Sequence, residues 1–125
     1  MIRYPLLAAI ALLAAAAPAR DRRAVPEATP TGPARSCIPL NQIRETRVHG
    51  DQVIDFVMRG GEVYRNTLPQ SCPELGFEER FGYKTSLSEL CSTDIITVLR
   101  TAPVMQGASC GLGQFQPVKL AGKAR

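Results

Sequence analysis

The first nineteen residues, MIRYPLLAAIALLAAAAPA, have the pattern of a secretory signal peptide. Arg3 precedes an apolar run from Leu6 to Ala17 that is shorter than the ~20 residues needed to span a bilayer. Small residues at 17 and 19 fit cleavage before Arg20, and the alternative is an uncleaved N-terminal anchor. We therefore expect a periplasmic or secreted chain with no membrane span in its mature form. Export constrains the fold, because it places all four cysteines in an oxidising compartment where they can pair.

The cysteines are spaced too widely for a redox or metal-binding motif. Successive cysteines lie 35, 19 and 19 residues apart, which excludes the CxxC pairs of thioredoxin-like sites and zinc ribbons. The single histidine also excludes a metal site built from several histidines. We expect two structural disulfides and neither a metal nor another cofactor. The cysteines concerned are Cys37, Cys72, Cys91 and Cys110.

The pairing that we expect follows from where turns and chain ends should meet. Cys72 and Cys91 belong to two predicted helical turns that flank residues 77–85, so we expect these two to pair. Cys37 begins the predicted domain and Cys110 precedes its last strand, so a closed sheet would bring them together. Connectivity cannot be deduced from the sequence alone, and the other pairings stay open.

Composition divides the rest of the chain into a linker, one domain and a tail. Residues 20–36 are rich in proline and arginine and poor in large apolar residues, which predicts a flexible linker. The domain is predicted at 37–118 and a basic tail at 119–125. Between Cys37 and Cys110 nine acidic residues outnumber seven basic ones, so the excess positive charge lies in the tails. Nucleic-acid-binding domains concentrate basic charge on one face, so we expect no nucleic-acid partner.

Strand patterns dominate the predicted domain. Residues 52–59 and 62–68 are rich in β-branched and aromatic residues, and Gly60-Gly61 between them is typical of a two-residue hairpin loop. Two Ser-x-x-Glu capping patterns predict short helical turns. We expect a mainly β, disulfide-stapled domain, arranged as a five-stranded meander or barrel-like sheet. The other predicted strands are at 43–49, 94–99 and 112–118, and the helical turns at 71–74 and 86–89.

Three segments carry a resemblance to a known family. They are YRNTLPQSCPELGF at 64–77, LCSTDIITVL at 90–99 and GASCGLGQF at 107–115. Together with Cys37 and the predicted hairpin, they resemble a family of small exported bacterial proteins known only as a domain of unknown function. The resemblance implies an exported single domain with paired cysteines, and it implies no particular activity.

The predicted hairpin defines a candidate binding face. A two-residue loop at Gly60-Gly61 sets Asp55 opposite Asn66 and divides the side chains between two faces. Ile54, Phe56, Met58 and Val63 then form the core face. On the other face a carboxylate lies opposite a carboxamide among apolar neighbours, which could bind a ligand or could simply bond across the strands. The candidate face consists of Asp55, Asn66, Tyr64 and Val57.

Single side chains elsewhere offer weaker candidates. Asp94 could act as a general acid or base, although an aspartate entering a strand more commonly bonds to nearby backbone. His49 could titrate near neutral pH, although a lone loop histidine is usually solvated. Glu78 and Glu79 are adjacent and would point to opposite sides of a strand. The glycine-rich segment 107–113 fits neither a P-loop nor a dinucleotide-binding spacing and predicts a turn around Cys110.

No catalytic signature combines a nucleophile with a base in this sequence. We therefore expect a non-catalytic envelope or protein-binding module whose partner is another exported or envelope protein. The alternatives are a small periplasmic hydrolase that uses Asp55 or Asp94, and a redox-active thiol protein. A deep pocket holding either aspartate would favour the hydrolase, and a flat apolar patch would favour the binding module.

Overall fold

The computed structural model describes residues 24–85 and 87–122, so the predicted signal peptide lies outside the described residues. This part of the chain is mainly β, as predicted, and it is stapled by two disulfides. Its ten strands form three antiparallel sheets rather than one five-stranded meander. None of its helices is long and apolar enough to cross a membrane.

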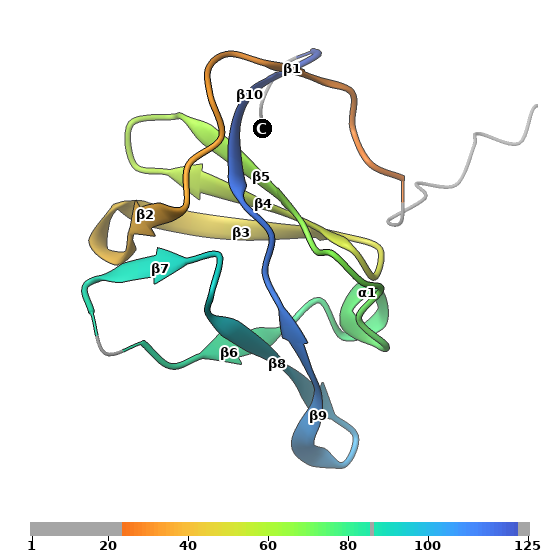
Figure 1. Ribbon diagram of the computed structural model, residues 1–125. Helices are drawn as coiled ribbons and strands as arrows, with labels where there is room; N and C mark the ends of the chain where they lie inside the picture. Colours follow the sequence, from red (N-terminus) through yellow and green to blue (C-terminus); the bar gives the residue numbers. More distant parts are fainter. Residues whose placement is uncertain (1–23, 86, 123–125) are drawn as a thin grey trace, which may run out of the picture.

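The three sheets are arranged as two layers with a short strand pair between them (Figure 1). The large sheet has the order β1-β10-β5-β4-β3 and uses β1 (Ala28–Pro30), β3 (Ile43–His49), β4 (Val53–Met58), β5 (Val63–Thr67) and β10 (Phe115–Leu120). The second layer has the order β6-β8-β9 and uses β6 (Phe81–Tyr83), β8 (Ile95–Thr101) and β9 (Val104–Gly111). The short pair is β2 (Cys37–Pro39) with β7 (Glu89–Cys91). Two helical turns, η1 (Leu40–Gln42) and α1 (Leu75–Glu78), complete the described elements.

The folded region extends into both segments that the sequence suggested were tails. Strand β1 lies within the predicted linker and pairs with β10, which itself continues to Leu120. The amide of Thr31 donates to the Pro117 carbonyl at 3.0 Å, and Arg35 exchanges backbone hydrogen bonds with Phe115. Pro30 is tolerated in β1 because a strand at the edge of a sheet needs no amide donor on its outer side.

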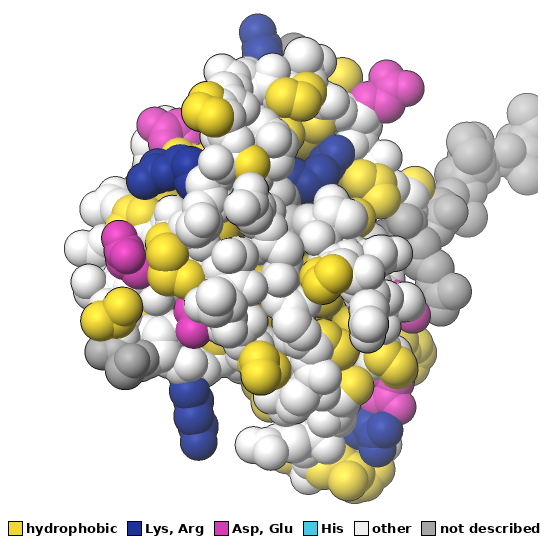
Figure 2. Space-filling model, viewed as in Figure 1, with side chains coloured by type: hydrophobic (Ala, Val, Ile, Leu, Met, Phe, Trp, Pro, Cys, Tyr) yellow, Lys and Arg dark blue, Asp and Glu magenta, His cyan; other side chains and the backbone are white. Residues whose placement is uncertain are grey.

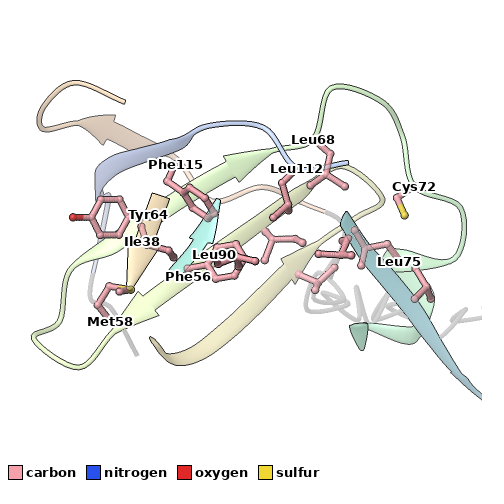
Figure 3. Packing of buried hydrophobic residues seen from close by; sticks show 14 residues of the cluster. Ile38, Phe56, Met58, Tyr64, Leu68, Cys72, Leu75, Leu90, Leu112 and Phe115 are labelled. Carbon is pink, nitrogen blue, oxygen red and sulfur yellow. The ribbon is translucent and has the colours of Figure 1, made fainter. Parts of the chain in front are cut away.

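The hydrophobic core lies between the large sheet and the β6-β8-β9 sheet. Phe56 of β4 is fully buried and makes an edge-to-face contact with Phe115 of β10, with ring centroids 5.4 Å apart. Figure 3 shows these rings with Ile38 and Leu90 of the β2–β7 pair beside them. The predicted core residues Ile54, Phe56 and Met58 are all buried on this side. Val63, the fourth residue expected on the core face, lies opposite Val57 on the other side of the sheet, because the register differs from the expected one.

The predicted hairpin is present, but its register differs by one residue from the expected one. Asp55 lies opposite Arg65 rather than Asn66, and Phe56 lies opposite Tyr64. The Met58 amide donates to the Glu62 carbonyl at 2.8 Å, so these two residues close a three-residue loop of 59–61. Gly61 has a positive φ of 89°, whereas Gly60 does not. A three-residue loop needs only one left-handed residue, so two adjacent glycines do not require the two-residue loop that we expected.

The predicted disulfide pairing is wrong, because the observed bonds are Cys37–Cys91 and Cys72–Cys110. Cys37 and Cys91 are direct cross-strand partners in the β2–β7 pair. The second predicted helical turn is also wrong, because Glu89 belongs to strand β7. Three-residue strands carry too little pattern to be recognised in a sequence, so this pairing was missed.

The first predicted capping box does not form either. Helix α1 lasts a single turn, and its N-cap is Glu74, in the left-handed region at φ 71°, without a side-chain capping bond. The Glu74 carboxylate instead accepts two hydrogen bonds from Arg100 of β8, at 2.5 and 2.6 Å. This ion pair raises the pKa of Arg100, chiefly through the hydrogen bonds from its guanidinium. A tertiary contact has therefore replaced the local one.

Candidate functional site

Asp55 is a buried carboxylate whose two oxygens are held by neighbouring strands. Its side chain is 1% exposed, and Arg65 of β5 binds it in a bidentate manner, from Nε to Oδ1 at 2.9 Å and from Nη2 to Oδ2 at 3.0 Å. His49 of β3 places Nε2 3.0 Å from the same Oδ2. The register explains the contact with Arg65, since the two residues are direct cross-strand partners. A carboxylate used in this way ties three strands together and leaves no oxygen free for a substrate.

The observed register divides the predicted binding face. Asp55 and Val57 lie on one side of the large sheet, while Tyr64 and Asn66 lie on the core side, because side chains alternate along each strand. Val57 is 3% exposed and Tyr64 7% exposed, so neither offers a surface contact. The prediction that these four residues share one face is therefore wrong.

Asn66 has a structural role on the core side. It accepts a hydrogen bond from the Gly113 amide at 2.8 Å and donates one to the Gly113 carbonyl at 2.6 Å. The backbone of Gly113 approaches β5 so closely that a Cβ there would clash with the Thr67 carbonyl oxygen. Asn66 therefore fixes the segment that leads into β10, and its fully buried carboxamide is not exposed to a ligand at the surface.

Tyr64 is likewise occupied. Its hydroxyl accepts a hydrogen bond from Arg35 Nη1 at 3.0 Å, and the guanidinium carbon lies 5.7 Å from the ring centroid. Arg35 precedes β2 and is already joined to β10 through its backbone. The contact therefore holds the N-terminal segment against the large sheet.

His49 joins the buried carboxylate to the surface. Its side chain is 15% exposed and lines a hollow of about 360 Å³ at the edge of β3, together with Thr46, Arg47, Val48 and Glu79. An aspartate–histidine pair supports nucleophilic catalysis when a serine, cysteine or threonine lies within reach of the other ring nitrogen. The hollow is lined by neither serine nor cysteine, and no hydrogen bond from the Thr46 hydroxyl to His49 exists among the described residues.

Asp94 closes a turn at the start of β8. Its Oδ2 accepts the Cys91 amide at 2.7 Å, while its own amide donates to the Cys91 carbonyl at 2.9 Å. The prediction that this aspartate bonds to nearby backbone is therefore confirmed. Asp94 also lines an open groove of about 540 Å³ on the outer face of the β6-β8-β9 sheet. Lys84 and Thr97 line this groove too, and the described residues contribute no serine, cysteine or histidine to it.

We expect Asp94→Ala to lower the free energy of unfolding by about 1–2 kcal/mol, because it removes a charge-assisted hydrogen bond that closes the turn. Urea denaturation of the oxidised protein measures this. Thr93→Ala, an exposed neighbour in the same turn, is the matched control and should change stability by less than about 0.5 kcal/mol. Equal losses in both variants would show that the carboxylate does not hold the turn.

Glu78 and Glu79 do not form a carboxylate pair. Glu78 ends α1 and accepts a hydrogen bond from the Thr101 hydroxyl at 3.1 Å. Glu79 is the left-handed C-cap of α1 and lines the hollow beside His49. They lie at the end of a helical turn, not on the strand that we expected.

Cys37, Glu89 and Cys91 place potential metal ligands within 4.8 Å of one another. The two sulfurs are bonded to each other in the Cys37–Cys91 disulfide, so neither is available as a thiolate. The oxidised protein therefore offers one carboxylate at this position, which is too few ligands to define a metal site.

The β8–β9 hairpin carries an exposed apolar tip that we did not predict. Val104 is 88% exposed and Met105 47% exposed, next to the exposed turn residues Ala102 and Pro103. Figure 2 shows hydrophobic side chains gathered at the end of the molecule where this hairpin projects in Figure 1. The sequence does contain a signal, because no charged residue occurs from position 101 to 118.

Comparisons with protein-family models, with curated proteins and with solved structures find no match.

Proposed function

We propose that this chain is an exported, non-catalytic module that binds another exported or envelope protein through the tip of the β8–β9 hairpin. The observation that carries the proposal is the exposure of Val104 and Met105 at the end of a projecting hairpin. Exposed apolar side chains that cluster on a surface are typical of interaction sites, because burying them against a partner releases about 25 cal/mol per Å².

The state of the two candidate carboxylates supports a binding role over hydrolysis. Asp55 has both oxygens occupied and lines neither the groove at Asp94 nor the hollow beside His49 in the described part of the chain. Asp94 does line the groove, and this observation favours a hydrolase. Its Oδ2 is engaged by the Cys91 amide, however, and the described lining of the groove lacks the histidine that would complete an acid–base pair.

Export is supported by two observations. The sequence has a signal-peptide pattern at residues 1–19, and both disulfides suit an oxidising compartment. We expect N-terminal sequencing of material from the periplasm or medium to begin at or next to Arg20. A membrane-bound form that retains Met1 would contradict this expectation.

The binding proposal can be tested by photocrosslinking in the cell. A photoreactive amino acid replaces Val104 in the full chain, and Leu87 is replaced in a matched control because it is also apolar and 67% exposed. We expect the probe at 104 to give one discrete adduct with an exported protein, identified by mass spectrometry, and the probe at 87 to give none.

A second variant separates a specific contact from general stickiness. Met105→Asp, combined with the probe at 104, should abolish the adduct, because a charge at the tip must be desolvated in the complex. Adducts of equal yield from both probe positions, or no adduct at 104, would contradict the proposal.

A further inference from the structure

Strand β9 forms an open edge of the β6-β8-β9 sheet in the described part of the chain. Its first three residues, Val104–Gln106, are all exposed. The pairing of β8 with β9 shifts register between Thr97 and Leu99, so β9 has a bulge after Gln106. Beyond this bulge, residues 69–73 lie beside β9 across a hollow of about 240 Å³. The accessible part of the edge is therefore the part next to the hairpin tip. Here a second strand could add to the sheet through its backbone.

The other edges of the described sheets carry features that oppose such pairing. The edge formed by β3 carries Arg44, Glu45 and Arg47, and the hydrogen bond from Arg47 lowers the pKa of Glu45, which keeps that carboxylate charged. Strand β1 has three residues and ends in Pro30. Strands β2, β6 and β7 also have three residues each. Charge, proline, shortness and bulges are the usual protections of an edge. The accessible part of β9 carries neither a charge nor a proline, so only its three-residue length and the bulge that follows it limit pairing there.

The β9 edge is also complementary to itself. The chain carries a formal net charge of +4, yet no charged residue lies between Arg100 and Lys119. Two copies that meet here bring no like charges together, whereas a pairing of two β3 edges would have to accommodate Arg44, Glu45 and Arg47 from each copy. A strand paired antiparallel with its own copy forms an isologous, two-fold contact that closes after two subunits.

We propose that two copies of this chain associate by antiparallel pairing of their β9 edges, with the Val104 and Met105 side chains packed across the two-fold axis. The inference rests on the proposed function: it uses the same surface, the tip of the β8–β9 hairpin, and the partner bound there is a second copy of this chain. The contact joins two three-stranded sheets into one of six strands. The open edge is short, so the interface belongs to the weak class that buries less than ~1,200 Å².

Sedimentation equilibrium of the oxidised mature protein tests this proposal over about 10 µM to 1 mM, the range in which a weak interface is populated. The wild-type chain should shift from monomer to dimer across this range and form no larger species. Val104→Lys should weaken the dimer about tenfold or more, because it places two ammonium groups near the axis. Ile95→Lys is the matched control: Ile95 is 58% exposed and β-branched, it lies on β8 away from the free edge, and its variant should dimerise like the wild-type chain.

The outcomes separate this inference from the proposed function. A wild-type chain that stays monomeric, or a Val104→Lys variant that dimerises like the wild-type chain, would overturn the inference. If the chain is monomeric but Val104 crosslinks to a different exported protein, the binding module stands and only the second copy is excluded. Equal weakening by Val104→Lys and Ile95→Lys would show that association does not use the β9 edge. Melting temperatures of both variants confirm that each is folded.

Discussion

Phe56→Ala is expected to lower the free energy of unfolding by about 4 kcal/mol, because it empties the centre of the hydrophobic core. Phe56 is fully buried, and its ring contacts those of Phe115 and Phe81 at centroid distances of 5.4 and 6.3 Å. Removing it leaves a cavity between the two layers, because rings held by different sheets cannot close together fully. Urea denaturation without reductant measures the change while both disulfides stay intact.

Phe77→Ala is the matched control for this prediction. Phe77 of α1 is 78% exposed, so the same truncation removes little buried surface and should change stability by less than about 0.5 kcal/mol. If the two substitutions cost the same, the core does not lie between the sheets as described.

Asp55→Asn is expected to cost about 3 kcal/mol, because it removes the charge that compensates the partly buried guanidinium of Arg65. If the hairpin had the two-residue loop expected from the sequence, Asp55 would lie opposite Asn66 and be half-covered, and Asp55→Asn would cost little stability. The observed register places Asp55 opposite Arg65 instead, so we expect a large cost. Thermal and urea melts of the variant measure the loss.

Two further variants show whether Asp55 acts through Arg65. Glu45→Gln changes an exposed carboxylate that is paired with Arg47 of the same strand, β3, and it should cost no more than about 0.5–1 kcal/mol. Combining Asp55→Asn with Arg65→Gln should cost less than the sum of the single changes, since neither partner then leaves an unpaired charge. An Asp55→Asn cost as small as that of Glu45→Gln would contradict a structural role for this carboxylate.

The sequence was informative wherever a pattern was long. Strands β4 and β5 were predicted from two runs of β-branched and aromatic residues, and Ile54, Phe56 and Met58 were assigned correctly to the core. The hairpin loop was located, but its length was not, because Gly60-Gly61 is compatible with loops of two and three residues. Because the loop is one residue longer than expected, Asn66 lies on the opposite side of the sheet from Asp55, and the four candidate residues do not share a face.

Short or tertiary features were not predictable. The Cys37–Cys91 bond depends on the three-residue strands β2 and β7, and the capping pattern at Glu74 yields to an ion pair with Arg100, which is distant in sequence. The sequence singles out Asp55 as a carboxylate opposite Asn66 among apolar neighbours, but the structure places it opposite Arg65 and buries it. Its partners Arg65 and His49 could be found only once the register was known. The turn predicted at 107–113 is wrong, because residues up to Gly111 belong to strand β9. The hairpin tip precedes that segment, and only the fold shows that Val104 and Met105 are exposed there.

Hydrogen–deuterium exchange of the mature protein at low and high concentration tests most directly whether β9 is the contact edge. Amide exchange reports backbone pairing residue by residue, and a strand added to an edge protects amides that were open to water. We expect exchange at 104–106 to slow as the concentration rises, with no change in β3 or in the groove residues around Asp94. Protection that appears at β3 or in the groove, or exchange that is independent of concentration throughout the chain, would contradict association through the β8–β9 hairpin.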